Sequence, residues 1–100
     1  MLWLITCEDK PDTAAVRAEH LTTHREYLSS RKDIIVLAGA KLSDDGEDMI
    51  GSCFVLNVKS RAEAKSFSDG DPFTKAGVFA KVEINRMRKG QWNPEVAEGA

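Results

Sequence analysis

The sequence lacks the features that mark several specialised classes of protein. Its two cysteines, Cys7 and Cys53, have no CxxC spacing and are too few for a disulfide framework. No apolar run approaches the roughly 20 residues of a membrane helix, and the apolar residues 1–7 carry neither the positive region nor the cleavage site of a signal peptide. We therefore expect reduced core cysteines, a cytoplasmic location and no membrane partner.

A surplus of charge is absent as well. The chain carries 14 basic and 16 acidic side chains, a formal net charge of −2, so it has no basic field with which to hold a phosphate backbone. Nucleic acid is therefore not an expected partner. With 42% hydrophobic and 30% charged residues in 100 positions, the sequence is typical of one folded domain with a modest core.

Hydrophobic patterning predicts six secondary-structure elements. Ser60 and Glu63 have the spacing of a capping box, Gly70 suits a helix C-terminus, and Pro72 cannot continue that helix. Asp45-Gly46 favours a hairpin turn inside the polar stretch 41–48. The predicted strands span residues 2–7, 34–38, 49–58 and 78–84, and the predicted helices span 13–32 and 60–69.

The order of these elements predicts an α+β fold of the ferredoxin-like, split βαβ type. In that fold one antiparallel sheet carries both helices on one face. The first three predicted strands are nonetheless apolar on both faces, and an apolar sheet face open to water is unfavourable. We therefore expect a homodimer that packs sheet against sheet, with higher assembly open.

The only two histidines, His20 and His24, lie four residues apart on the first predicted helix and therefore share a face. Both fall at the border of the stripe that we expect to face the sheet, where an imidazole is half-buried. That stripe consists of four apolar side chains at helical spacing, namely Ala14, Ala18, Leu21 and Leu28.

Asp71 is the predicted partner of His20. Proline at position 72 restricts Asp71 to extended backbone conformations, which fixes the direction of its carboxylate. A carboxylate on one ring nitrogen of a histidine sets the tautomer and stabilises the imidazolium, so the pair is suited to proton transfer near neutral pH. The alternative is that Asp71 only ends a helix and that His20 is a satisfied border residue.

Three further residues are candidate binding groups, each with a plain alternative. Ser52 follows Gly51 inside a strand and is placed to donate a hydrogen bond to a substrate. Phe73 either walls an apolar cavity or packs in the core. Arg17, one turn before His20, either binds an anionic group or is a solvated helix charge.

Metal binding is not expected. The zinc-binding helix pattern requires glutamate directly after the first histidine, where this chain has Leu21, so His24 is assigned to solvent or to an interface. The four acidic residues between positions 44 and 48 lack the twelve-position ligand pattern of a calcium loop and read as a solvated turn.

Several short segments together give this chain a resemblance to the YciI-like family over residues 1–86, with 87–100 as a C-terminal tail. The segments are residues 17–21, 38–42, Gly51-Ser52, 71–73 and 76–79. The resemblance implies a dimeric α+β barrel similar in architecture to muconolactone isomerase, with a site of one histidine and one aspartate that fall on His20 and Asp71. His24, residues 44–48 and the tail do not match the family pattern.

These observations predict a cofactor-independent enzyme that acts on a small organic molecule by acid–base catalysis. An isomerase or an elimination-type lyase fits a histidine–aspartate pair. The competing interpretations are a non-catalytic module that binds a small ligand and an accessory dimerisation domain.

Overall fold

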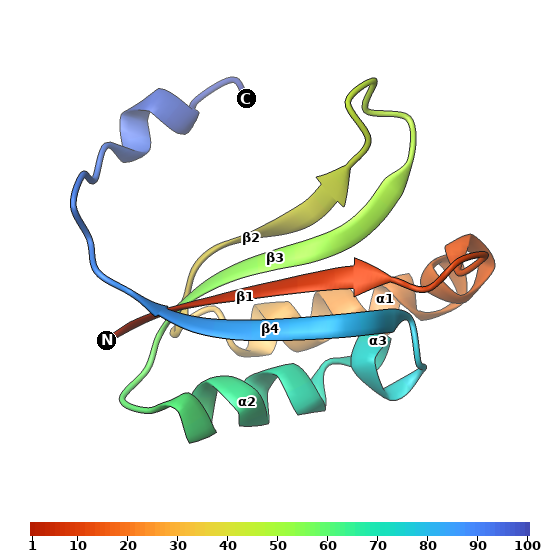
Figure 1. Cartoon of the computed structure of the whole chain (residues 1–100), viewed down its shortest axis with the longest axis horizontal. Helices are drawn as coiled ribbons and strands as arrows, with labels where there is room; N and C mark the ends of the chain where they lie inside the picture. The colour runs from red at the N-terminus through yellow and green to blue at the C-terminus, as the bar shows by residue number, and fades with distance from the viewer.

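The computed structural model describes residues 1–100, which form a four-stranded sheet with helices on one face (Figure 1). A short 3-10 helix, η1, follows the last strand in the C-terminal tail. The elements in chain order are β1 (Leu2–Asp9), α1 (Ala14–Ser30), β2 (Ile35–Leu42), β3 (Met49–Asn57), α2 (Arg61–Gly70), α3 (Pro72–Lys75), β4 (Phe79–Met87) and η1 (Pro94–Ala97).

The sheet has the strand order β2-β3-β1-β4, and every neighbouring pair is antiparallel. This order and the helices on a single face confirm the predicted α+β, ferredoxin-like fold. The last strand, β4, lies at an edge of the sheet, next to β1. The opposite face of the sheet is not covered by any helix (Figure 1).

Local signals explain most of the boundaries. The N–H of Glu63 donates to Ser60 Oγ over 3.2 Å, and the Glu63 carboxylate accepts from the N–H of Lys59, so the predicted cap of α2 is present. Gly46 has φ of +75° in the β2–β3 turn. Pro72 ends α2 but also starts α3, because a first-turn residue needs no N–H.

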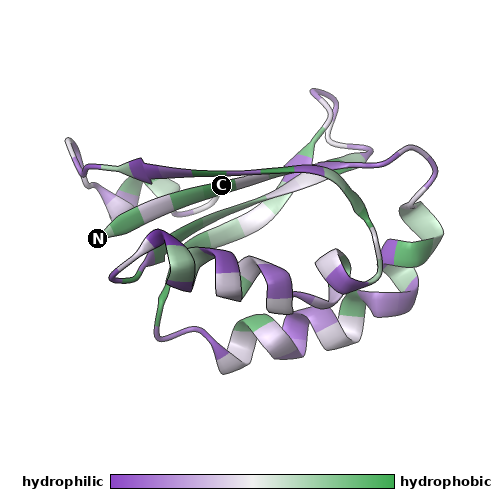
Figure 2. Cartoon of the chain, turned by 60° about the horizontal axis from the view of Figure 1, so that its bottom comes forward, coloured by the Kyte–Doolittle hydropathy of each residue, from purple (hydrophilic) through white to green (hydrophobic).

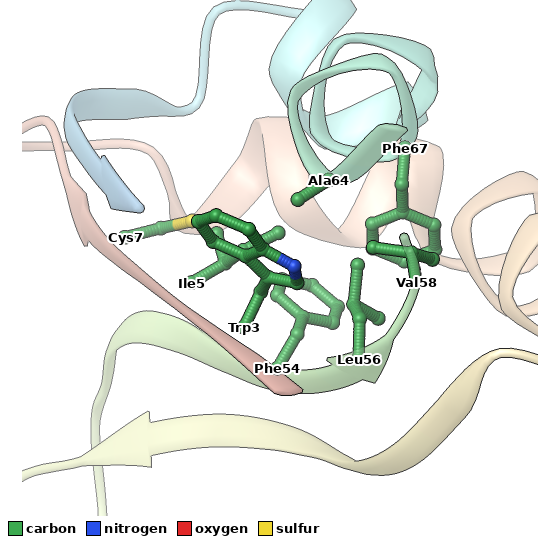
Figure 3. Close-up of a cluster of buried hydrophobic side chains, with 8 residues drawn as sticks. All are labelled: Trp3, Ile5, Cys7, Phe54, Leu56, Val58, Ala64 and Phe67. Atoms are coloured by element: carbon green, nitrogen blue, oxygen red, sulfur yellow. The ribbon is translucent and has the colours of Figure 1, made fainter. Parts of the chain in front are cut away.

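The core lies between the sheet and α2 (Figure 3). β1 and β3 direct alternate side chains toward the helices, and α2 contributes its apolar stripe. Eight buried residues form this cluster, namely Trp3, Ile5, Cys7, Phe54, Leu56, Val58, Ala64 and Phe67. α1 adds Tyr27 and Leu28 at its edge, so only the second half of that helix has an apolar contact with the cluster.

The predicted inward stripe of α1 is wrong in its first half. Ala14 and Ala18 are exposed, whereas Arg17 and His24 are buried against the rest of the chain. The predicted stripe assumes that the apolar face of α1 turns toward the sheet. In this helix the buried face carries polar groups, because partners for them lie on β1, β3 and α3.

The open face of the sheet is apolar in its central part. Leu4 of β1 lies opposite Val55 of β3, which in turn lies opposite Leu37 of β2, and residues directly opposite share a face. Leu37 is 62% exposed. The strands carry much of the hydrophobic surface, and the helices are largely hydrophilic or neutral (Figure 2). No helix combines the length and the apolar character needed to span a membrane.

Gly51 is required by a close approach of two strands, as its unusual place in a strand indicated. A Cβ atom at this position would lie 2.1 Å from the carbonyl oxygen of Cys7 on β1. Gly39, on the neighbouring strand β2, has no atom within 4 Å of the equivalent position. The two glycines therefore differ in packing while both lie inside strands.

We expect Gly51→Ala to lower the free energy of unfolding by about 2 kcal/mol or more, because the backbone of β1 must move to admit the methyl group. Gly39→Ala is the matched control and should leave stability unchanged or raise it by up to about 1 kcal/mol. Urea unfolding of both variants measures the difference. Equal losses in the two variants would contradict the close approach.

The Cys7 thiol makes stability depend on alkaline pH. Burial, aided by the nearby Asp71 carboxylate, raises its pKa from 9.0 to about 12. The unfolded chain therefore releases this proton at lower pH than the folded chain, and the thiol's contribution to stability is lost as pH rises from about 9 to about 12. In Cys7→Ala the free energy of unfolding should fall less steeply above pH 9.0 than in the wild type. Parallel pH profiles of the two proteins by urea unfolding would argue against it.

Candidate active site

A buried arginine organises the first half of the site. Arg17 projects from α1 and is only 4% exposed. Its Nε and Nη2 atoms donate to the two carboxylate oxygens of Asp9, at the end of β1, over 2.6 and 3.0 Å. Nη2 also donates to the Gly51 carbonyl oxygen and to Ser52 Oγ, at 2.8 and 3.0 Å. Arg17 thus connects α1 to both central strands of the sheet.

One nitrogen of this guanidinium is left available. Arg17 Nη1 makes no hydrogen bond within the chain, yet it is not among the enclosed polar atoms that lack a partner. The other nitrogens are engaged with Asp9, Gly51 and Ser52, so the group is held in one orientation with a free N–H edge. Such an edge can bind an anion or a polarised oxygen.

A histidine–aspartate pair forms the second half. His24 Nδ1 lies 2.7 Å from Asp71 Oδ1, and both residues are buried. The same Asp71 oxygen accepts the N–H of Phe73 over 2.9 Å and thereby caps α3. Asp71 has the extended backbone, φ −64° and ψ 126°, that a following proline favours. The carboxylate is therefore fixed before any ligand arrives.

The pair leaves the second ring nitrogen of His24 available. Because a carboxylate only accepts, Nδ1 carries the proton of the short hydrogen bond, and Nε2 of the neutral ring is then an acceptor. His24 Nε2 has no partner in the chain and is not one of the fully enclosed polar atoms. The chain therefore presents a free ring nitrogen on His24 as well as a free N–H edge on Arg17.

Phe73 joins the two halves. Its ring stacks on the His24 imidazole with 3.9 Å between the centroids, and the Arg17 guanidinium carbon lies 4.8 Å from the ring centroid. Phe79 packs edge-on against Phe73, with 6.4 Å between the ring centroids. The result is a rigid aromatic wall, with the nitrogens of Arg17 and His24 next to it.

The predicted contact between His20 and Asp71 is wrong. Asp71 contacts His24 instead, and the nearest charged partner of His20 is Glu19, at 4.0 Å. The His20 side chain is 37% exposed, whereas that of His24 is 11% exposed, so the assignment of His24 to solvent or to an interface is also wrong.

The spacing of residues along α1 explains why Asp71 contacts His24 and not His20. At about 100° per residue, Arg17 and His24 are separated by two nearly full turns and point within about 20° of one another, while His20 points about 60° from Arg17. Once Arg17 is buried, His24 shares its direction and His20 does not. The seven-residue spacing of Arg17 and His24 was the available signal in the sequence.

The other predicted residues meet at this site. Arg17, Ser52, Phe73 and Asp71 come from three separate parts of the chain and are connected by the contacts above. Asp9 was missed, because nothing in the sequence distinguishes it from neighbouring acidic residues after a strand. No group of three or more His, Cys, Asp or Glu side chains is arranged to hold a metal ion.

This arrangement can combine two chemical operations. His24 Nε2 can accept a proton while Asp71 stabilises the imidazolium that forms. Arg17 Nη1 can stabilise negative charge that develops elsewhere on the same molecule. Both groups are anchored by residues that do not need to move.

The chain is similar to several solved structures. 5-Chloro-2-hydroxyhydroquinone dehydrochlorinase (TftG) from Burkholderia phenoliruptrix AC1100, in complex with 2,5-dihydroxybenzoquinone, is 37% identical with a TM-score of 0.82. The match covers 90% of this chain and 96% of that one. Atu4242 from Agrobacterium tumefaciens is 16% identical with a TM-score of 0.55, covering 94% of this chain and 98% of its own, which shows a shared fold alone.

Curated relatives and the family comparison agree with that match. Protein YciI of Escherichia coli O6:H1 is 29% identical over 98 residues, which cover 89% of this chain and 98% of that protein. An uncharacterized protein of Haemophilus influenzae is 26% identical over the same coverage. Residues 1–88 match the YCII-related domain, and the chain belongs to that family.

Proposed function

We propose that this protein is an enzyme that eliminates a proton and an anionic leaving group from a small hydroxylated ring compound. It does so by acid–base chemistry that needs no cofactor. The observation that carries the proposal is the buried His24–Asp71 pair at 2.7 Å with Arg17 beside the same aromatic ring. An elimination needs a base for the proton and a cation for the departing anion, and these are the two groups that the site offers.

His24 is the base in this proposal. Its free Nε2 accepts a proton from the substrate, and the electron pair of the broken bond forms a new π bond. The Nδ1–H remains hydrogen-bonded to Asp71, whose negative charge stabilises the imidazolium. The role predicted for His20 passes to His24, because the carboxylate near the His20 ring is that of Glu19, at 4.0 Å, which is too far for a hydrogen bond that would orient the ring.

Arg17 and Ser52 serve the leaving group. The leaving atom departs with its bonding pair, and the free Nη1 of Arg17 faces the charge that develops. Asp9 holds the guanidinium in place through two hydrogen bonds, and the Ser52 hydroxyl, which accepts from Nη2, can donate its own proton toward the substrate. Phe73, only 1% exposed, packs under the His24 ring and holds that ring in position.

The comparison with TftG supports this reaction class. That protein is named a dehydrochlorinase, so the reaction in its name removes hydrogen and chlorine from one molecule, and it binds a dihydroxylated quinone. Because the two chains are 37% identical over nine-tenths of this chain, we propose for this protein a related elimination reaction on a related ring compound. The proposal names the class of reaction and leaves the leaving group open.

The matched histidines of α1 give a direct test. With 5-chloro-2-hydroxyhydroquinone as probe, His24→Gln should lower kcat by about 100-fold or more, because it removes the general base. His20→Gln lies one turn away on the same helix and should keep kcat within about threefold, since His20 does not contact the dyad. Chloride release measures both variants, and circular dichroism checks that each variant is folded.

Two outcomes would contradict the proposal in different ways. Equal losses of kcat in His24→Gln and His20→Gln would show that the His24–Asp71 pair has no special role in the reaction. No turnover by the wild type with this probe, together with saturable binding of 2,5-dihydroxybenzoquinone that His24→Gln weakens, would favour the ligand-binding module instead.

Self-association is the second part of the proposal. Residues 1–86 form the domain, 87–100 the tail, and the apolar open face of the sheet packs on that of another copy. Leu37 alone leaves 62% of its surface exposed on a face that carries Leu4 and Val55 as well. Light scattering after size exclusion should give about twice the chain mass of 11.0 kDa. A mass of 11.0 kDa that persists at high protein concentration would refute the homodimer.

A further inference from the structure

A large groove lies at one end of the open sheet face. It has a volume of about 1040 Å³ and opens between the sheet and the residues that follow β4. Leu2, Leu37 and Val55 form its apolar floor, and Arg86, Arg88 and Lys89 line its wall. No acidic residue lines it. The groove therefore suits an occupant that is both apolar and negatively charged.

The groove wall beyond Arg86, which belongs to β4, comes mostly from the residues that follow that strand. Residues 88–100, the C-terminal arm, make no hydrogen bond or ion pair with the rest of the chain. Trp92 lines the groove and remains 58% exposed. A tryptophan held over an apolar floor without filling it leaves room for a partner.

A segment of matching chemistry lies at the other end of the same sheet. The tip of the β2–β3 hairpin, residues 42–50, carries four carboxylates between apolar shoulders. Leu42, Met49 and Ile50 are each about half exposed. Asp45 is used to hold the turn, by accepting from Ser43 Oγ and from the N–H of Glu47. The side chains of Asp44, Glu47 and Asp48 have no partner within the chain.

We propose that the hairpin tip of a second copy occupies the groove, with its carboxylates against Arg88 and Lys89 and its apolar shoulders on the floor. This inference rests on the homodimer proposed above and specifies its register. It gives both the acidic turn and the basic tail a role that the candidate active site does not provide.

The geometry of the sheet permits this exchange twice in one dimer. β3 runs from Met49 at the tip to Asn57 at the groove, so tip and groove are separated by about 30 Å at 3.3 Å per residue. The hairpin tip and the C-terminal arm both rise on the open side of the sheet, at opposite ends (Figure 1). A twofold axis across the strands brings each tip to the groove of the other copy, which makes the contact isologous.

Charge complementarity selects the second copy over other partners. The three free carboxylates of the tip, those of Asp44, Glu47 and Asp48, meet the cations of the wall, and the arrangement repeats at both ends of the twofold contact. The tip of the same chain cannot reach its own groove, because the length of β3 separates them. A second copy supplies the tip without any further component.

The contact between tip and groove can be tested by reversing the charges of the groove wall, those of the hairpin tip, and both sets together. Arg88→Glu with Lys89→Glu should raise the dimer dissociation constant about tenfold or more at low salt, and Asp44→Lys with Glu47→Lys should do the same. The variant with all four changes should return to within about threefold of the wild type, because the charges are exchanged. Analytical ultracentrifugation at low salt measures each constant.

The control reverses two cations on the helical side. Arg25→Glu with Lys32→Glu changes the net charge as much as the reversal of Arg88 and Lys89. Arg25 is exposed on α1 and Lys32 lies in the turn that follows this helix, so the change should leave the dissociation constant unchanged. Asp45 is kept in every variant so that the turn stays intact.

Each outcome decides between the two proposals. A wild-type dimer whose dissociation constant ignores both charge reversals would overturn the tip-in-groove register, leave the homodimer standing and point to another acidic occupant. A monomeric wild type would overturn both, while the chloride-release assay on His24→Gln would still judge the chemistry. Rescue by the fourfold variant, but not by the control changes, would support the register.

Discussion

The burial of Arg17 is the constraint on which the rest of this structure depends. A guanidinium removed from water must be paired, and here Asp9, Gly51 and Ser52 supply acceptors from two strands. These contacts fix how α1 is rotated over the sheet. His24, two turns further along, is carried by the same rotation into contact with Asp71. The helix is thus oriented by polar contacts in its first half and by apolar ones only in its second.

The same constraint explains which parts of the structure the sequence could predict. The strands and α2 follow apolar runs, a capping box and turn residues, and those signals are local. Asp71 could be identified because a helix end and a proline fix it in place. The face of α1 could not, because an amphipathic pattern identifies apolar residues, and here the buried residues are polar. The apolar stripe does not separate His20 from His24, which lie at the same border of it, and the prediction of His20 rests on the family resemblance.

Gly51 shows how closely packing and chemistry are connected in a small domain. The lack of a side chain lets β1 and β3 approach at the position where Arg17 reaches the Gly51 carbonyl oxygen. Ser52 then follows with its hydroxyl on the helical side of the sheet. One glycine therefore sets both the spacing of the central strands and the height of the guanidinium above them.

The polar inner face of α1 also has an evolutionary consequence. In many enzymes the catalytic groups are strained, so that replacing them gains stability at the expense of turnover. Here Arg17 and Asp9 form part of the contact between helix and sheet, and deleting one partner of a buried ion pair costs about 3–5 kcal/mol. A lineage that loses Arg17 or Asp9 would thus lose stability together with the activity. Descendants of this chain with other substrates are therefore expected to keep the ion pair and to diverge around it.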